Sequence, residues 1–139
     1  METISKLHDT TLQSHPLTHS RLKYLSNLAQ TTEDHISRLA LSLSISKPPP
    51  KPDWTPTEHH SEKNSPTEIK GKQLRGRTLF KDDVELWMAL LLREQQPVDY
   101  EEWRLSFRLH WERGVEDLMG KSLENGDWIR TIRACLPPA

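Results

Sequence analysis

The sequence predicts an all-α protein in which two helical regions are joined by a flexible linker. Leucine, isoleucine and alanine are concentrated in residues 22–45, and tryptophan, leucine, valine and phenylalanine in residues 79–136. The stretch between them is polar and rich in proline, and only 34% of the 139 residues are hydrophobic, which argues against one large core. We therefore expect an N-terminal helical or coiled-coil region at 1–46, a proline-rich linker at 47–77 and a tryptophan-rich helical module at 78–136.

The N-terminal region is expected to hold a short helix and a longer one. A helix within 3–14 ends before Pro16, because proline lacks an N–H group and disfavours helix in the preceding residue. The longer helix covers 21–45, with Thr18 or Ser20 as its N-terminal cap. Seven of its residues are separated alternately by three and four positions, which is the spacing of a heptad repeat: Leu22, Leu25, Ala29, Thr32, Ile36, Leu39 and Leu43.

This spacing keeps one seam of the helix facing a partner. The seam can pair with a helix of another chain, or it can pack on the C-terminal module of the same chain. Either way it needs a partner surface, because such a helix is marginal alone in water. The residues expected to make the contact are Leu22, Leu25, Ile36, Leu39 and Leu43.

The linker is expected to be disordered or in the polyproline II conformation. Five prolines fall between Pro48 and Pro56, and the rest of the segment has too few apolar residues to offset the entropy of ordering. Trp54 is the one tryptophan in this polar stretch. A tryptophan presented on a stiff segment is a candidate linear motif for a partner protein.

The C-terminal module is expected to contain three helices and no strand. The first, over about 79–95, is apolar on two faces: Phe80, Val84, Trp87, Met88 and Leu91 on one, and Leu79, Leu86 and Leu90 on the other. A helix of this kind is buried on two sides. Asp99 with Glu102 resembles a capping box that opens the second helix. We expect a kink at Gly114, an end at Gly120, and a third helix capped by Asp127 with its Trp128, Ile129, Ile132 and Leu136 facing inward.

Four tryptophans dominate the apolar content of the module: Trp87, Trp103, Trp111 and Trp128. Most of them are expected in the core, because each can bury a large area. One or two are expected to project outward as anchors for a partner, since tryptophan is enriched at binding hot spots. A module of this size is marginal alone, which favours a shared core.

The net charge of −1 favours neither nucleic acid nor a membrane surface. The basic residues Lys70, Lys72, Arg75 and Arg77 form the one local positive run. They support an alternative function as a nucleic-acid-associated factor, with Lys81 at the end of the run, although the module itself holds an excess of acidic residues.

Residues for catalysis or metal binding do not form a pattern. The single cysteine, Cys135, excludes an intrachain disulfide. His110 with Glu112 or Glu116 is the strongest acid–base candidate, but such pairs are common on helices. We expect no enzyme activity, no metal, no cofactor and no small-molecule substrate.

The sequence therefore indicates a scaffold or adaptor subunit of a larger complex. Other proteins are the expected partners, in a hetero-complex rather than a homo-oligomer. No apolar run reaches the roughly 18 residues of a membrane span, so we expect a soluble intracellular protein of the nucleus or cytoplasm, with the basic run tilting toward the nucleus.

Overall fold

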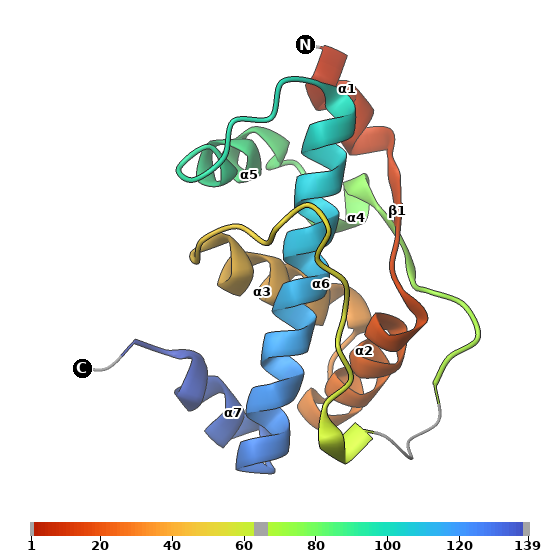
Figure 1. Ribbon diagram of the computed structural model, residues 1–139, viewed down its shortest axis with the longest axis vertical. Coiled ribbons are helices and arrows are strands. Elements are labelled where there is room, and N and C mark those ends of the chain that lie inside the picture. The colour runs from red at the N-terminus through yellow and green to blue at the C-terminus, as the bar shows by residue number, and fades with distance from the viewer. Residues whose placement is uncertain (1, 63–66, 138–139) are drawn as a thin grey trace.

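The longest helix, α6 (Tyr100–Asn125), runs along the long axis of the computed structural model, which describes residues 2–62 and 67–137 (Figure 1). The Asp99 side chain accepts a hydrogen bond from the Glu102 N–H at 2.9 Å, which confirms the predicted start of this helix. The predicted end at Gly120 is wrong. The helix continues to Asn125 and ends at Gly126, whose φ of 85° favours glycine.

Residues 16–45 form two helices, α2 (Pro16–Ala29) and α3 (Glu33–Ile45), where one was predicted. Gln30 has left-handed backbone with φ 56°, and the Thr32 side chain caps α3 by accepting from the His35 N–H at 3.2 Å. Pro16 begins α2 instead of ending an earlier helix, because the first position of a helix needs no N–H partner. Both helices pack on α6.

α3 crosses α6 at Gly114. A Cβ atom at this position would lie 2.0 Å from the carbonyl oxygen of Ala40, so the approach of the two backbones requires glycine. The predicted kink at Gly114 is replaced by a close helix contact, and α6 continues through this residue.

Two strands of three residues, β1 (Thr11–Gln13) and β2 (Gln73–Arg75), pair as an antiparallel ribbon. Leu12 lies opposite Leu74, and both are buried while the residues beside them are exposed. The sequence predicted no strand, because three residues are too few to show the apolar–polar alternation that marks one. The ribbon joins the N-terminal region to a segment that was predicted as linker.

At one end of α6, α1 (Glu2–Asp9) packs against α4 (Gly76–Phe80) and α5 (Val84–Leu91) (Figure 1). α4 and α5 replace the single helix predicted over 79–95. Lys81, with φ 53°, interrupts the helix between them. The break allows Phe80, Val84 and Leu91 to enter the same core.

α7 (Trp128–Cys135) lies at the opposite end of α6. The Asp127 side chain accepts from the Arg130 N–H at 2.8 Å, which confirms the predicted cap. Ile129 and Leu136 were predicted to face inward but are 66% and 61% exposed. The helix rests on its neighbours by the opposite side, where Thr131 is fully buried.

The segment predicted as a flexible linker lies against the helices where the structure describes it. Pro50 is buried, and the Thr57 N–H donates to a carboxylate oxygen of Glu116 on α6 at 2.6 Å. A short 3₁₀ helix, η1 (His60–Glu62), follows, and Glu62 is buried. Residues 63–66 of the predicted linker lie outside the described residues. The described part thus differs from a free tether.

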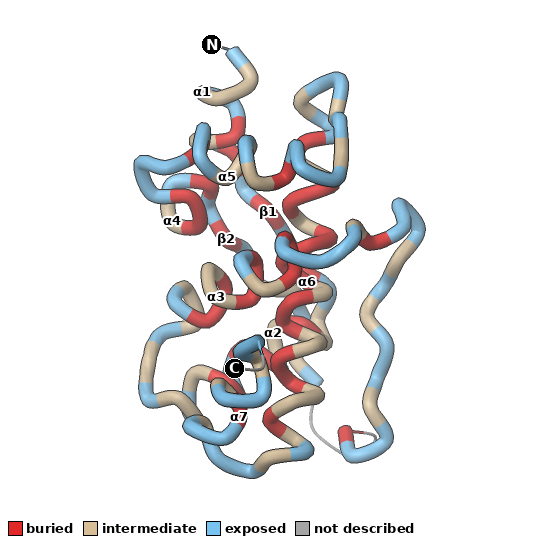
Figure 2. Tube along the Cα trace, turned by 90° about the vertical axis from the view of Figure 1, so that its left-hand side faces the viewer, coloured by how far each residue is buried: buried red, intermediate tan, exposed pale blue. Residues whose placement is uncertain are grey.

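One apolar core runs through the molecule. It contains buried residues from α1 to α6, including Leu7, Leu22, Ile36, Phe80 and Trp111, and Figure 2 shows buried positions recurring along α6. The regions predicted at 1–46 and 78–136 therefore share a core, because the apolar side of each covers the other. Within the described ranges, no helix has the length and apolarity needed to cross a bilayer.

The Gly114 contact predicts opposite effects for two similar substitutions. Gly114→Ala should lower the free energy of unfolding by about 2 kcal/mol, because the added methyl group meets the Ala40 backbone. Gly120→Ala should raise it by up to about 1 kcal/mol, because its nearest neighbour lies at an ordinary 3.4 Å and alanine favours helix. Urea unfolding measures both, and a stabilised Gly114→Ala variant would contradict the close crossing.

Candidate functional site

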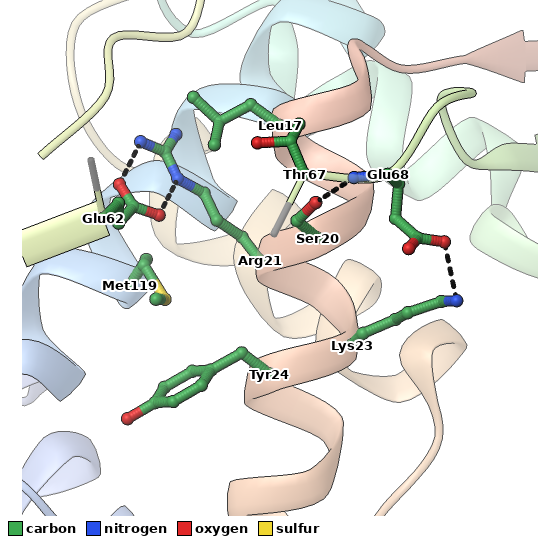
Figure 3. Close-up of a pocket in the computed structure, with 9 residues that line it drawn as sticks. All are labelled: Leu17, Ser20, Arg21, Lys23, Tyr24, Glu62, Thr67, Glu68 and Met119. Atoms are coloured by element: carbon green, nitrogen blue, oxygen red, sulfur yellow. Dashed lines mark hydrogen bonds and ion pairs between the residues drawn. The ribbon is translucent and has the colours of Figure 1, made fainter. Parts of the chain in front are cut away.

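An arginine is buried where α2, α6 and η1 meet. Arg21 is 1% exposed, and its Nε and Nη2 atoms donate to the Glu62 carboxylate at 3.0 and 2.8 Å. Its Nη1 atom donates to Glu116 at 2.9 Å, and Nη2 also reaches the Thr57 carbonyl. Figure 3 shows the Arg21–Glu62 pair beside a hollow. The cluster ties the segment before residue 63 to two helices.

The opposite charges of Arg21 and its carboxylate partners stabilise each other. Burial alone would raise the pKa of Glu62, but the hydrogen bonds and positive charge of Arg21, with the His59 N–H, hold that pKa below its ordinary value. Burial would lower the pKa of Arg21, whereas the two carboxylates raise it. Both groups are therefore ionised and paired in the folded chain.

The hollow beside this pair has a volume of about 290 Å³, just below the usual range for ligand sites. Most of its wall is apolar, and several of its polar groups already have partners: Ser20 accepts from the Glu68 N–H at 2.7 Å, and Lys23 pairs with Glu68 at 2.6 Å (Figure 3). The guanidinium of Arg21 is directed at its own carboxylates. We therefore assign this cluster a structural role.

A second buried carboxylate anchors the start of α2. Glu112 is fully buried and accepts from the His15 N–H at 2.7 Å and the Thr18 hydroxyl at 2.8 Å. Its other oxygen pairs with Arg108 at 2.7 Å. This contact orders the backbone just before Pro16, where the sequence had placed a helix end.

His110 does not pair with Glu112 or Glu116, the partners that the sequence suggested. Its Nδ1 atom lies 2.9 Å from the Ser44 hydroxyl, and its Nε2 atom lies 3.0 Å from the Gln95 side-chain oxygen. Burial and the nearby Arg113 lower the pKa of His110 from 6.5 to about 4. Ser44 and His110 are 0% and 2% exposed, so this serine–histidine pair has no access for a substrate.

The outward side of α5 is apolar. We define the α5 outer face as Leu86, Ala89 and Leu90. Leu86 is 58% exposed, Ala89 is exposed, and Leu90 is half-buried at the edge of the core. Val84 and Leu91 on the inner side are 5% and 2% exposed, so the helix is held firmly while its outer face meets solvent.

The structure separates the residues that were predicted to bind a partner. Leu22, Leu25 and Ile36 are buried in the chain's own core, which corresponds to the second of the two packings that the sequence allowed. Leu39 and Leu43 are half-buried against that core. Among the tryptophans, Trp103 and Trp111 are buried, and Trp54, Trp87 and Trp128 are half-buried. Of the predicted set, Trp87 alone belongs to α5, and it packs against the core beside the outer face.

The sequence did contain a signal for this face. Leu86 and Leu90 belong to the second apolar side predicted for the first helix of the module. Both apolar sides were expected to be buried. Only the inner side is buried, because α5 packs against α1 and its other side is open to solvent.

The structure also separates the residues of the basic run, since within the described part of the chain some of them form ion pairs and others do not. Lys72 lies 3.3 Å from Glu33 and 4.0 Å from Asp34, and Arg77 pairs with Asp9 at 2.7 Å. Lys70 and Arg75 are exposed and form no ion pair with another described residue. Arg75 lies on the outward side of the ribbon.

Comparison with known proteins adds no family: the chain matches no protein-family model, no curated protein and no solved structure.

The environment of His110 predicts a loss of stability in acid. In the unfolded chain this histidine takes up a proton near pH 6.5, whereas in the folded chain it stays neutral down to about pH 4. Its contribution is therefore complete above pH 6.5 and is lost as the pH falls toward 4, which amounts to about 3 kcal/mol.

Urea unfolding of the native chain and of His110→Gln, measured from pH 7 to pH 4, tests this. The native chain should lose more stability than the variant, because glutamine has no proton to take up. Equal pH dependence in the two proteins would contradict a buried neutral imidazole.

Proposed function

We propose that this chain is a non-catalytic protein–protein interaction subunit, a scaffold or adaptor of a larger intracellular complex, and that it docks through the α5 outer face. The observation that carries the proposal is the exposure of Leu86 and Ala89 on a helix whose inner side is firmly buried. Apolar side chains gathered on one exposed helix face are typical of a docking surface.

The placement of α5 supports this proposal. Leu86, Ala89 and Leu90 follow the spacing of three and four residues that forms one stripe along a helix. Leu92, just past the helix, is 48% exposed and extends the apolar area. Because Val84 and Leu91 anchor the inner side, a partner would meet a rigid surface and would lose little entropy in ordering it.

Loss of the face should release the partner. The full chain carrying Leu86→Ser and Ala89→Glu, tagged and expressed at native level in its source cells, should retain at least tenfold less of the subunit that co-purifies with the native chain. Both positions are exposed, so circular dichroism should show an unchanged fold.

Ile69→Ser is the matched control, because Ile69 is 94% exposed and lies away from α5 in the sequence. It should retain the same subunit as the native chain. Equal retention by the double variant, or the absence of any subunit with the native chain, would exclude this function.

A nucleic-acid-associated factor is the second candidate. The outward side of the ribbon carries Thr11, Gln13, Gln73 and Arg75, and none of them is acidic. Arg104 of α6 extends this side, since it donates to the Thr11 carbonyl at 2.8 Å. Arg75 and Arg104 supply the positive charge that phosphate contacts require, and Asp9 is an acidic neighbour of Arg75.

Binding of labelled duplex DNA at rising salt concentrations tests this candidate. Lys70→Glu with Arg75→Glu should lower the affinity at least tenfold and reduce its salt dependence, because these two side chains form no internal ion pair among the described residues. Lys72→Gln should have a smaller effect, since Lys72 is already paired. Failure of the native chain to bind at low salt would remove the candidate.

A further inference from the structure

We propose that the α5 outer face binds a basic amphipathic helix of a partner protein. This inference rests on the proposed docking function and names the chemistry of the partner. It draws on the charges that flank the face, on a hollow beside it, and on the shape of its apolar stripe.

The charges around the face are mostly negative. Residues 81–102 hold seven acidic and two basic residues, all of them exposed. None of the seven acidic side chains forms an ion pair with another described residue. These acidic residues are Asp82, Asp83, Glu85, Glu94, Asp99, Glu101 and Glu102.

Elsewhere in the chain several carboxylates are paired. Glu62, Glu68, Asp117 and Glu112 each lie within 3.2 Å of a basic side chain. The stretch that flanks the α5 outer face thus holds seven acidic side chains that form no ion pair with another described residue. A partner with positive charge would complement them and bind faster than a neutral one.

A hollow of about 190 Å³ lies between α1 and α5. Its lining contains the acidic Asp82 and Glu85 and the apolar Ile4 and Val84, with Ser5, His8 and Lys81 completing it. It adjoins the α5 outer face, because Glu85 directly precedes Leu86 and lies one helical turn from Ala89. A lysine or arginine can lay its apolar stem in such a hollow and bring its charge to the carboxylates.

The shape of the face favours a helix as the occupant. Leu86 and Leu90 form a ridge along α5, and the small Ala89 leaves room beside it for a side chain of a second helix. The occupant therefore needs an apolar stripe that packs on this ridge and basic residues on the flanks of that stripe. A solvated acidic surface accounts for the charges alone and leaves the exposure of Leu86 unexplained.

Two peptides of about 18 residues, five helical turns each, test the proposal with the full chain. One is an amphipathic helix of leucine and lysine, and the other has the same leucine positions with glutamate in place of lysine. Fluorescence anisotropy should show at least tenfold tighter binding of the lysine peptide. Equal binding of the two peptides, or failure to bind the lysine peptide, would overturn the proposal.

Two sets of variants place the binding on this face. Leu86→Ser with Ala89→Glu should weaken binding of the lysine peptide at least tenfold. Asp82→Asn, Glu85→Gln and Glu94→Gln together should weaken it about fivefold at low salt and remove most of its salt dependence. Full affinity in either set overturns the assignment. The matched control, Glu58→Gln with Glu124→Gln, changes exposed acidic residues elsewhere and should leave the affinity unchanged.

Sedimentation equilibrium of the native chain separates a partner from a second copy. A concentration-dependent dimer that Leu86→Ser with Ala89→Glu abolishes would make a second copy the occupant and overturn the proposal. Failure here is distinct from failure of the docking function. If the double variant loses its co-purifying subunit but the native chain binds both peptides equally, the function stands and only the basic partner is excluded.

Discussion

The burial of the middle of α6 is the constraint on which the rest of the structure depends. Carboxylate and imidazole groups buried on such a helix need hydrogen-bond partners. Glu112 is bound by the residues that start α2, Glu116 by Arg21 and the Thr57 backbone, and His110 by Ser44 of α3. Each partner comes from a different part of the sequence. The polar groups of α6 therefore hold the surrounding segments in place, while its apolar groups supply the core.

This arrangement explains why α5 differs from the other helices. α5 lies at one end of α6 beside α1, and α1 covers one side of it (Figure 1). The outer face thus remains apolar and open, whereas the seam on α2 and α3 is used internally. The heptad spacing had predicted a partner contact at Leu22 and Ile36. Because these residues are used internally, the proposed partner contact lies instead at Leu86 and its neighbours.

Local signals in the sequence predicted helix starts better than helix breaks. Asp99 and Asp127 cap α6 and α7 as predicted, because an aspartate cap acts on a backbone N–H only three residues away. The breaks at Gln30 and Lys81 were missed. Both residues adopt positive φ without being glycine or asparagine, so their identity carries no warning. The ribbon was missed because its pairing joins residues about sixty positions apart.

The sequence by itself determined the helical class and the capped starts of α6 and α7, because these follow from periodicity and from contacts within one turn. Only the tertiary structure decided which apolar faces are covered. The pairing of Arg21 with Glu62, the crossing at Gly114 and the packing of α1 on α5 all depend on residues distant in sequence. Leu86 is exposed because α5 packs against α1 by its other side.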